Sequence, residues 1–105
     1  MRDNEFKWDD RKAAANFRKH HVAFDFARSA FDDKKVFERL DTDETDEERF
    51  LATGLAGVRM LTICYTQRGP RKRIISAWKA TRNEQNSYNE QNRDTIKSGA
   101  AKESP

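Results

Sequence analysis

Three consecutive apolar runs between residues 48 and 80 constrain the fold of this chain most strongly. The runs ERFLATGLA, VRMLTICYTQR and KRIISAWKA are rich in β-branched and aromatic residues, and only the turns Ala56-Gly57 and Gly69-Pro70 separate them. Such a composition favours β-strands, and turns this short join strands that run antiparallel. The sequence therefore predicts an antiparallel meander.

Helices are predicted on both sides of the meander. Apolar residues recur at helical spacing up to His20, after an aspartate that can cap the helix, and again over residues 24–31. After the last strand, Thr81 and Glu84 have the spacing of a capping box, which marks a final helix. The polar residues 94–105 have nothing to bury, so we expect a flexible tail after one domain of residues 1–93.

The remaining segments complete an α+β fold. KKVFERLD is predicted as a fourth strand, and Phe6-Lys7-Trp8 as a short strand or turn. DTDETDEE carries six acids in eight residues, so it is expected to be a solvated loop. The predicted architecture is two N-terminal helices, an antiparallel sheet of about four strands and a C-terminal helix.

The positive charge is concentrated in one block of the chain. The net charge is only +3, but residues 58–82 carry seven basic groups and no acidic ones. A polyanion is the partner that such a block favours, because its phosphates are neutralised by lysine and arginine. A chain of 105 residues builds one modest core, so any function must share this single scaffold.

Several classes of protein and of site are disfavoured. No apolar run is long enough to cross a bilayer and the N-terminus lacks a secretory pattern, so we expect a cytoplasmic protein without a membrane partner. The lone Cys64 is expected to be a small core residue rather than a nucleophile. Adjacent His20 and His21 with one cysteine make no zinc pattern, and no glycine-rich phosphate loop is present, so no metal or cofactor is expected.

Three stretches carry a longer pattern in a fixed order. NFRKHHVAFDFARSAFDD, ERFLATG and YTQRGPRKRIISAWKATRNEQNSYNE together resemble the BrnT family, with its Lys-His-Gly-Val segment, Glu-Arg strand, Thr-x-Arg-Gly hairpin, Arg-Ile-Ile-Ser-Ala strand and Ala-Thr-x-x-Glu-x-x-x-Tyr helix. The resemblance spans roughly residues 6–90. It implies a RelE-like ribonuclease toxin of a type II toxin–antitoxin module, which arrests growth by cutting RNA.

The resemblance also implies partners and draws attention to two departures. The expected partner is a BrnA-like ribbon-helix-helix antitoxin in a 2:2 heterotetramer, with operator DNA contacted only through the antitoxin. The family has glycine where this chain has His21, a position after a helix that favours a positive φ. It has arginine where this chain has Trp78, which can stack on a base but cannot neutralise a phosphate.

Metal-free RNA cleavage of this kind uses the ribose 2′-OH as an internal nucleophile. The protein must accept a proton from that hydroxyl, stabilise the charged transition state and protonate the leaving oxygen. Arg68 and Arg73 flank the tight turn, and the planar donors of arginine match phosphate oxygens in pairs, so these two are the first candidates for stabilising the transition state.

The candidates for proton transfer each have a structural alternative. His20 can act in catalysis or make a helix-end contact, Glu84 can serve only the capping box, and Glu48 can form a plain ion pair beside Arg49. For each aromatic residue packing in the core is favoured over stacking on RNA, with Trp78 the exception to test. The remaining candidates for binding RNA are Lys19, Arg49, Lys72, Trp78, Lys79 and Arg82.

Two other functions remain open. With tryptophan in place of arginine, the protein can be a catalytically weakened member of the same fold that binds antitoxin or RNA. Outside the family, it can be a small basic adaptor without catalytic function.

Overall fold

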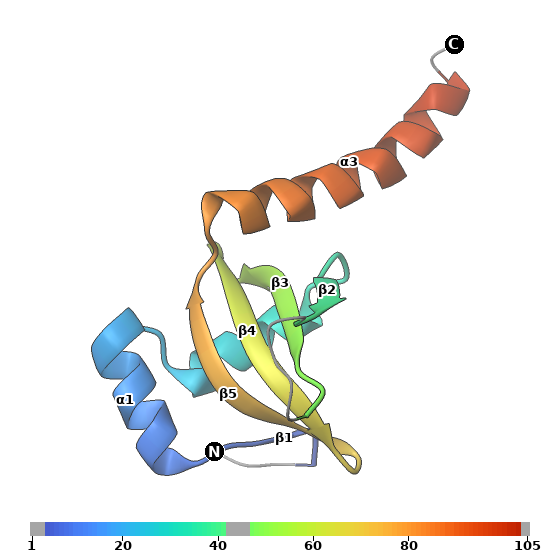
Figure 1. Cartoon of the computed structure of the whole chain (residues 1–105). Coiled ribbons are helices and arrows are strands. Elements are labelled where there is room, and N and C mark those ends of the chain that lie inside the picture. The colour runs from blue at the N-terminus through green and yellow to red at the C-terminus, as the bar shows by residue number, and fades with distance from the viewer. Residues whose placement is uncertain (1–3, 42–46, 104–105) are drawn as a thin grey trace.

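A five-stranded sheet forms the centre of the chain (Figure 1). The computed structural model describes residues 4–41 and 47–103, and their side chains as far as residue 92. The strand order is β1-β5-β4-β3-β2. The strands are β1 (Phe6–Lys7), β2 (Phe37–Leu40), β3 (Phe50–Ala56), β4 (Arg59–Arg68) and β5 (Arg71–Lys79).

The predicted meander is confirmed, and the predicted strand number is corrected. Strands β2 to β5 pair antiparallel with their neighbours in sequence, and the turns of the two long hairpins contain Gly57 at φ 64° and Gly69 at φ 59°. A fifth strand, β1, pairs parallel with β5 through Phe6↔Lys72 and Lys7↔Arg73. The sequence indicated Phe6-Lys7-Trp8 as a short strand or turn, and Phe6–Lys7 forms the strand. Two residues are too short to show a period, so the parallel pairing with β5 was not part of the prediction.

The N-terminal half contains one full helix and a shorter irregular one. Helix α1 (Asp10–His20) begins at Asp9, whose carboxylate accepts the backbone N–H groups of Arg11 and Lys12, and ends at His21 with φ 60°. The expected second helix is only one α-helical turn, α2 (Phe24–Ala27), continued by a 3₁₀ segment, η1 (Arg28–Asp32).

Close contact with the sheet accompanies this irregular geometry. A Cβ atom added at Gly54 of β3 would lie 2.9 Å from the carbonyl oxygen of Ala30 in η1. Helical periodicity in the sequence identified this segment but could not show that its second half tightens into a 3₁₀ form.

The last helix, α3, extends over Arg82–Glu103. Thr81 and Glu84 form the predicted capping box: Thr81 N donates to Glu84 Oε1 at 2.8 Å, and Glu84 N donates to Thr81 Oγ1 at 3.1 Å. The helical backbone thus includes most of the segment predicted as a tail. The side chains beyond residue 92 lie outside the described part, so the flexibility of residues 94–105 and a boundary at residue 93 stay predictions.

The partly buried carboxylate of Asp33 fastens α3 to the body of the protein. Asp33 accepts hydrogen bonds from Leu55 N at 2.9 Å, Lys35 N at 2.9 Å and the Tyr88 hydroxyl at 2.7 Å. Burial alone would raise the pKa of Asp33, but these three donors outweigh it and lower the pKa. Burial and the same bond raise the pKa of Tyr88 to about 12.

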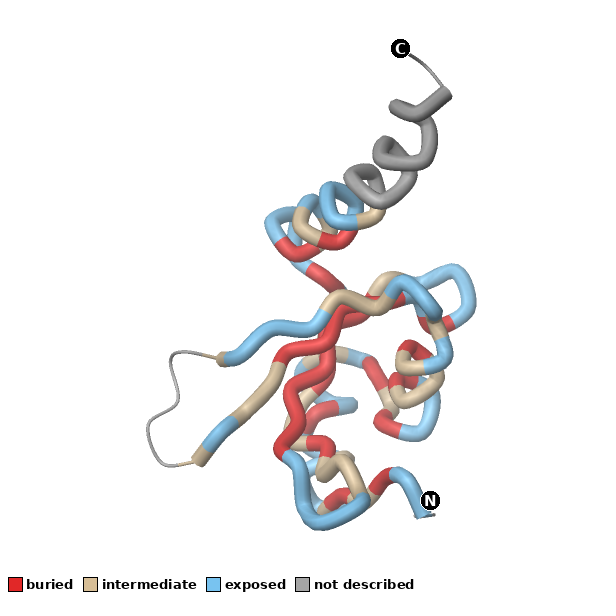
Figure 2. Tube along the Cα trace, turned by 90° about the vertical axis from the view of Figure 1, so that its right-hand side faces the viewer, coloured by how far each residue is buried: buried red, intermediate tan, exposed pale blue. Residues whose placement is uncertain are grey.

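The two faces of the sheet differ in what covers them. Helix α2 and η1 pack behind the sheet of Figure 1, against a core that includes Val22, Phe24, Leu61, Ile63 and Ile74. Figure 2 shows that the residues of the central strands are mostly buried. We call this side the covered face. The opposite side carries Thr62, Cys64, Thr66, Ser76 and Trp78, and we call it the open face. It meets the start of α3 at Thr62 and Trp78, and α1 reaches its edge at Ser76 and Trp78.

Two smaller expectations can be compared with the structure. Cys64 is buried, as predicted for a small packed residue. Among the described residues, no helix has both the length and the apolar character needed to span a membrane.

Candidate functional site

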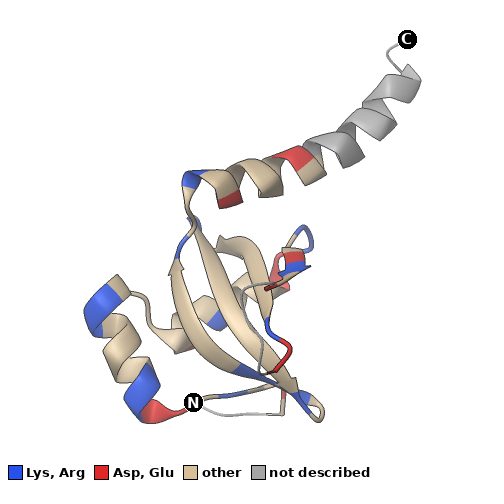
Figure 3. Cartoon of the chain, in the orientation of Figure 1, with Lys and Arg blue, Asp and Glu red and all other residues tan. Residues whose placement is uncertain are grey.

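Four arginines belong to the open face by strand alternation and register. Arg73 of β5 pairs with Thr66, and Arg68 lies two residues further along β4 on the same side. Arg39 of β2 pairs with Leu51, and Arg49 precedes Leu51 by two residues. Figure 3 shows basic residues gathered at the hairpin end of the sheet. These four side chains, Arg39, Arg49, Arg68 and Arg73, are called the arginine face below.

A β-bulge in β5 determines which side chains join this face. Tyr65 pairs with Ile74, whereas Cys64 pairs with Ser76, so Ile75 is the additional residue. Without it, alternation would place residues 73 and 78 on opposite sides of the sheet. With it, Trp78 pairs with Thr62 and lies on the same side as Arg73.

Arg68 is engaged by an acidic side chain that the sequence did not single out. Its Nη2 atom lies 3.0 Å and 3.2 Å from the two carboxylate oxygens of Glu47, at the end of the acidic segment. Both side chains are partly exposed, at 45% and 38%, so water and salt screen the pair. Residues 42–46 of the predicted acidic loop lie outside the described residues.

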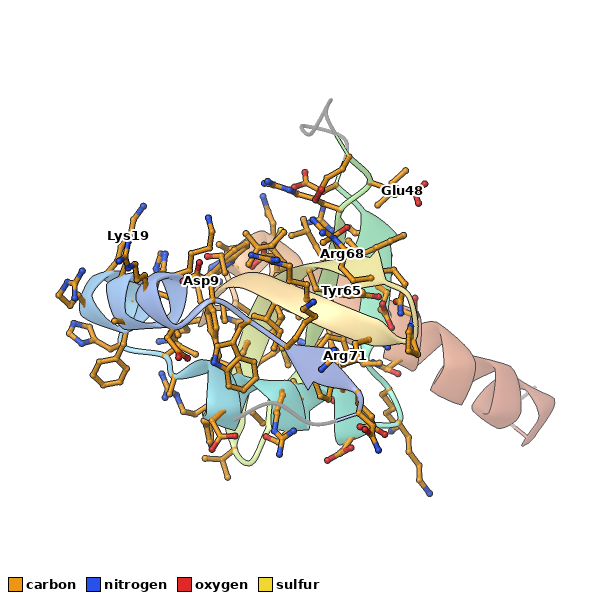
Figure 4. All side chains as sticks on the ribbon, turned by 90° about the horizontal axis from the view of Figure 1, so that it is seen from below. Asp9, Lys19, Glu48, Tyr65, Arg68 and Arg71 are labelled. Atoms are coloured by element: carbon orange, nitrogen blue, oxygen red, sulfur yellow. The ribbon has the colours of Figure 1, made fainter. Side chains whose placement is uncertain are left out.

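Arg73 lies close enough to the start of α1 to influence it electrostatically. The pKa of Asp9 is lowered chiefly by the backbone N–H groups of Arg11 and Lys12, and the positive charge of Arg73 contributes in the same direction. Figure 4 shows the hairpin end from below: Arg68 lies on the same side as the exposed Glu48, while Arg71 lies toward β1.

Glu84 is the centre of a hydrogen-bond cluster at the other end of the open face. In addition to its cap bond, Oε1 accepts from Thr62 Oγ1 at 2.9 Å and from Trp78 Nε1 at 3.1 Å. Its second oxygen lies 3.7 Å from the Arg39 guanidinium. The capping role predicted for Glu84 is confirmed, and its buried Oε1 atom is already occupied by three donors.

His20 and Trp78 are neighbours beside this cluster. Their rings are 6.2 Å apart between centroids and tilted by 47°. His20 is the last residue of α1, and Asn16 fixes this helix against β5: the Asn16 amide bonds the backbone N–H and C=O of Ala77 at 3.1 Å and 2.9 Å. The same side chain also accepts from Ser76 Oγ at 3.0 Å and donates to the Val22 carbonyl at 3.0 Å. Asn16 therefore takes the place of a neighbouring strand where β1 has ended.

Lys72 and Tyr65 lie on the covered face, away from the arginines. The Lys72 ammonium lies 5.5 Å from the Phe31 ring centroid and 5.6 Å from that of Tyr65. The Tyr65 hydroxyl donates to Glu38, and burial followed by this bond raises the pKa of Tyr65. This cluster keeps the tyrosine neutral and packs Lys72 against rings.

The structure thus divides the predicted site residues into groups. Arg49, Arg68 and Arg73 lie toward the hairpin, and His20, Trp78 and Glu84 toward the start of α3. Along β5, residues 73 and 78 are roughly 16 Å apart at about 3.3 Å per residue, less the shortening at the bulge. Three other candidates lie elsewhere: Lys79 lines a hollow with Arg59 and Gln85, Arg82 begins α3, and Lys72 is on the covered face.

The sequence did not identify four residues that now belong to the candidate site. Glu47 was one acid among six, and Arg39 required the β2–β3 register to be placed. Asn16 was visible only as the first residue of the family-like segment. Lys12, on the side of α1 facing β5, carried no signal of its own.

The comparison with protein-family models gives one match. Residues 8–84 match the model described as the ribonuclease toxin BrnT of type II toxin–antitoxin systems. The chain belongs to the BrnT toxin family. No curated protein matches the chain. A ribonuclease toxin is therefore the family-level function, and an antitoxin is the partner that a type II system implies. The described residues of this BrnT-family protein contain no cluster of three or more histidine, cysteine, aspartate or glutamate side chains suited to a metal.

Proposed function

We propose that this BrnT-family protein is a metal-independent endoribonuclease that cleaves RNA through the ribose 2′-OH and thereby inhibits translation and growth in the cytoplasm. The observation that carries the proposal is the arginine face: Arg39 of β2, Arg68 of β4, Arg73 of β5 and Arg49, the residue before β3, lie on the same side of the sheet. Such groups bind phosphate oxygens in pairs and stabilise the added charge of a phosphorane-like transition state.

Arg73 and Arg68 are the proposed transition-state stabilisers. Arg73 is anchored in the middle of a paired strand, whereas Arg68 must exchange Glu47 for the phosphate. Arg49 is the proposed additional contact to the RNA backbone. A rigid strand holds an arginine with little loss of side-chain freedom on binding, which favours Arg73 as the larger contributor.

The choice of the groups that transfer protons depends on two points: whether the side chain lies near the arginines at the hairpin end, and whether its atoms are already engaged in hydrogen bonds. Glu48 is exposed beside the start of β3, on the Arg68 side of the molecule, so it can reach a substrate held there. Glu84 is occupied by three donors, and His20 lies toward the far end of β5. We therefore propose Glu48 as the general base, with a solvent-exposed basic side chain or water protonating the leaving oxygen.

The proposed antitoxin is a BrnA-like protein with a ribbon-helix-helix part, in a 2:2 assembly that contacts operator DNA only through the antitoxin. We propose that an acidic segment of the antitoxin silences the toxin by covering the arginine face. Its negative charge is complementary to the arginines, so it would compete directly with RNA phosphates.

Expression in a bacterial host tests the toxin function. The wild-type chain should arrest growth, and co-expression of the antitoxin from the neighbouring reading frame should restore it. Arg73→Ala and Arg68→Ala should abolish arrest, whereas Arg18→Ala, which removes the same charge from an exposed position on α1, should not. Growth unaffected by the wild-type chain at verified soluble expression would contradict the proposal.

A second function is favoured by the environment of Trp78. Its indole N–H is committed to Glu84, so this position supplies no charge to a phosphate. The protein can then act mainly by binding antitoxin or RNA, with weak cleavage. Trp78→Arg tests this alternative, because the guanidinium can keep the bond to Glu84 and add a positive charge. A large gain of cleavage rate would favour the weakened enzyme, and an unchanged or lower rate would count against it.

A further inference from the structure

A groove between α1 and β5 adjoins the arginine face. Its volume is about 210 Å³. One wall is the side of α1, and the other is β5 at its bulge. The lining includes Lys12, Asn16, Lys19, His20, Ile75 and Ser76. The bulge residue Ile75 and the Asn16 bonds to β5 give the groove a fixed shape, because they set how α1 lies along the strand.

Two lysines lie along the helical wall of this groove. Lys12 and Lys19 are seven residues apart, which is close to two helical turns and places them on one side of α1. Both are exposed, and neither forms an ion pair within the described part of the chain. Arg68 and Arg39, by contrast, already face Glu47 and Glu84. Lys12 is attracted to the nearby Asp9 carboxylate, whose pKa it helps to lower, but neither lysine is held in an ion pair with a described residue that an incoming anion would have to break.

An aromatic pair lies at one end of the groove. His20 lines it, and the half-buried Trp78 ring is 6.2 Å from the His20 ring. The bond from Trp78 Nε1 to Glu84 fixes the plane of the indole. A fixed aromatic surface beside two cations combines the two features by which proteins bind single-stranded nucleic acid, stacking on bases and contact with phosphates.

We propose that the α1–β5 groove binds the single-stranded RNA next to the cleaved phosphate, with Lys12 and Lys19 contacting phosphates and Trp78 stacking on a base. The proposal rests on the ribonuclease function above and adds the direction in which the substrate continues. The strand passes from Arg73 along β5 to Trp78, both of which the bulge places on the open face. A base inside a duplex cannot stack on the indole, so the groove selects unpaired RNA.

The test measures the affinity of the full-length protein for a fluorescent single-stranded RNA made uncleavable by 2′-O-methyl groups. Lys12→Gln/Lys19→Gln is compared with Arg11→Gln/Arg18→Gln. The control pair removes the same charge from the same helix at the same spacing, but does not line the groove. The lysine variant should weaken binding about tenfold and lower the salt slope by about 1.4, at roughly 0.7 per phosphate contact. The arginine variant should change the affinity less than threefold.

If both double variants weakened RNA binding equally, the proposed role of the groove would be refuted, because the result would show only a general attraction of RNA to a basic helix. A second comparison isolates the stacking: Trp78→Phe should keep most of the affinity, and Trp78→Ala should lose about fivefold or more. If both bind as the wild type does, Trp78 does not stack and the proposal fails. Cleavage of ordinary RNA with affinities insensitive to Lys12 and Lys19 would refute the groove alone, whereas lysine-dependent binding without cleavage would refute the ribonuclease function and keep the groove.

Discussion

Substitution of Glu84 separates a structural carboxylate from a catalytic one. Glu84→Ala removes one acceptor from three donors, Thr81 N, Thr62 Oγ1 and Trp78 Nε1, at 2.8, 2.9 and 3.1 Å. Each bond is worth about 1 kcal/mol net, and a buried hydroxyl left without its partner adds to the loss, so the free energy of unfolding should fall by about 2–4 kcal/mol. That is a large share of the total stability expected for a domain of this size.

The isosteric Glu84→Gln variant should behave differently. Its Oε1 can still accept all three donors, and only the contact of the second oxygen with Arg39 at 3.7 Å is lost, so a decrease of about 1 kcal/mol is expected. Thr81→Ala, which removes the other half of the capping box, should cost about 1 kcal/mol as a control. Urea unfolding measures these changes.

RNA cleavage by the same variants completes the test. The structural account predicts that Glu84→Gln keeps its cleavage rate within a few-fold of the wild type under conditions where both are folded. A proton carrier would instead lose about 10²- to 10⁴-fold on this substitution. A Glu84→Gln protein with wild-type stability and a cleavage rate reduced by that factor would refute the capping account.

Three further predictions concern separate parts of the molecule. Glu47→Gln should free Arg68 and tighten binding of uncleavable RNA roughly two- to fivefold at low salt, as expected for an exposed pair; looser binding would show that the pair positions the arginine. His21→Gly should raise the free energy of unfolding by about 1 kcal/mol, because His21 adopts φ 60°, and a fall in the urea midpoint would contradict this. Because folding lowers the pKa of Asp33 below its value of about 4 in the unfolded chain, its carboxylate stabilises the fold above pH 4, and this contribution is lost on acidification. Because folding raises the pKa of Tyr88, its contribution is present below pH 10, the pKa of an unfolded tyrosine, and is lost as the pH rises above it. Urea unfolding at several pH values measures this. In Asp33→Asn the free energy of unfolding should fall less at both acidic and alkaline pH than it does in the wild type. An unchanged pH dependence would show that the Asp33–Tyr88 contact does not cause it.

Local patterns in the sequence were sufficient for most of the fold. The meander, the first helix and the capping box of the last helix follow from strand composition, cap residues and the i, i+3 spacing of Thr81 and Glu84. Phe6–Lys7 was predicted as a short strand or turn, but its parallel pairing with β5 could not be predicted, because two residues carry no signal for the strand with which they pair. Residues 28–32 read as a regular helix, but packing against Gly54 accompanies a 3₁₀ geometry there.

The candidate site was harder to predict because it depends on which face each strand residue occupies. The bulge at Ile75 leaves no mark in the sequence, yet it puts Trp78 on the side of Arg73. Lys72, chosen for its place in a basic run, alternates with Arg73 in the hairpin and so lies on the covered face beside Phe31. The positive φ at His21, by contrast, was predicted from the family-like glycine position and is confirmed.

Cleavage of a chemically defined RNA tests the central claim most directly. The purified protein, in excess EDTA, is given a single-stranded RNA and the same strand with 2′-deoxyribose at the nucleotide preceding the cut. The account predicts cleavage of the first with a 2′,3′-cyclic phosphate product, no cleavage at the modified position, and loss of both activity and product in Arg73→Ala. Cleavage that requires a divalent cation, or that proceeds equally at the 2′-deoxy position, would contradict it.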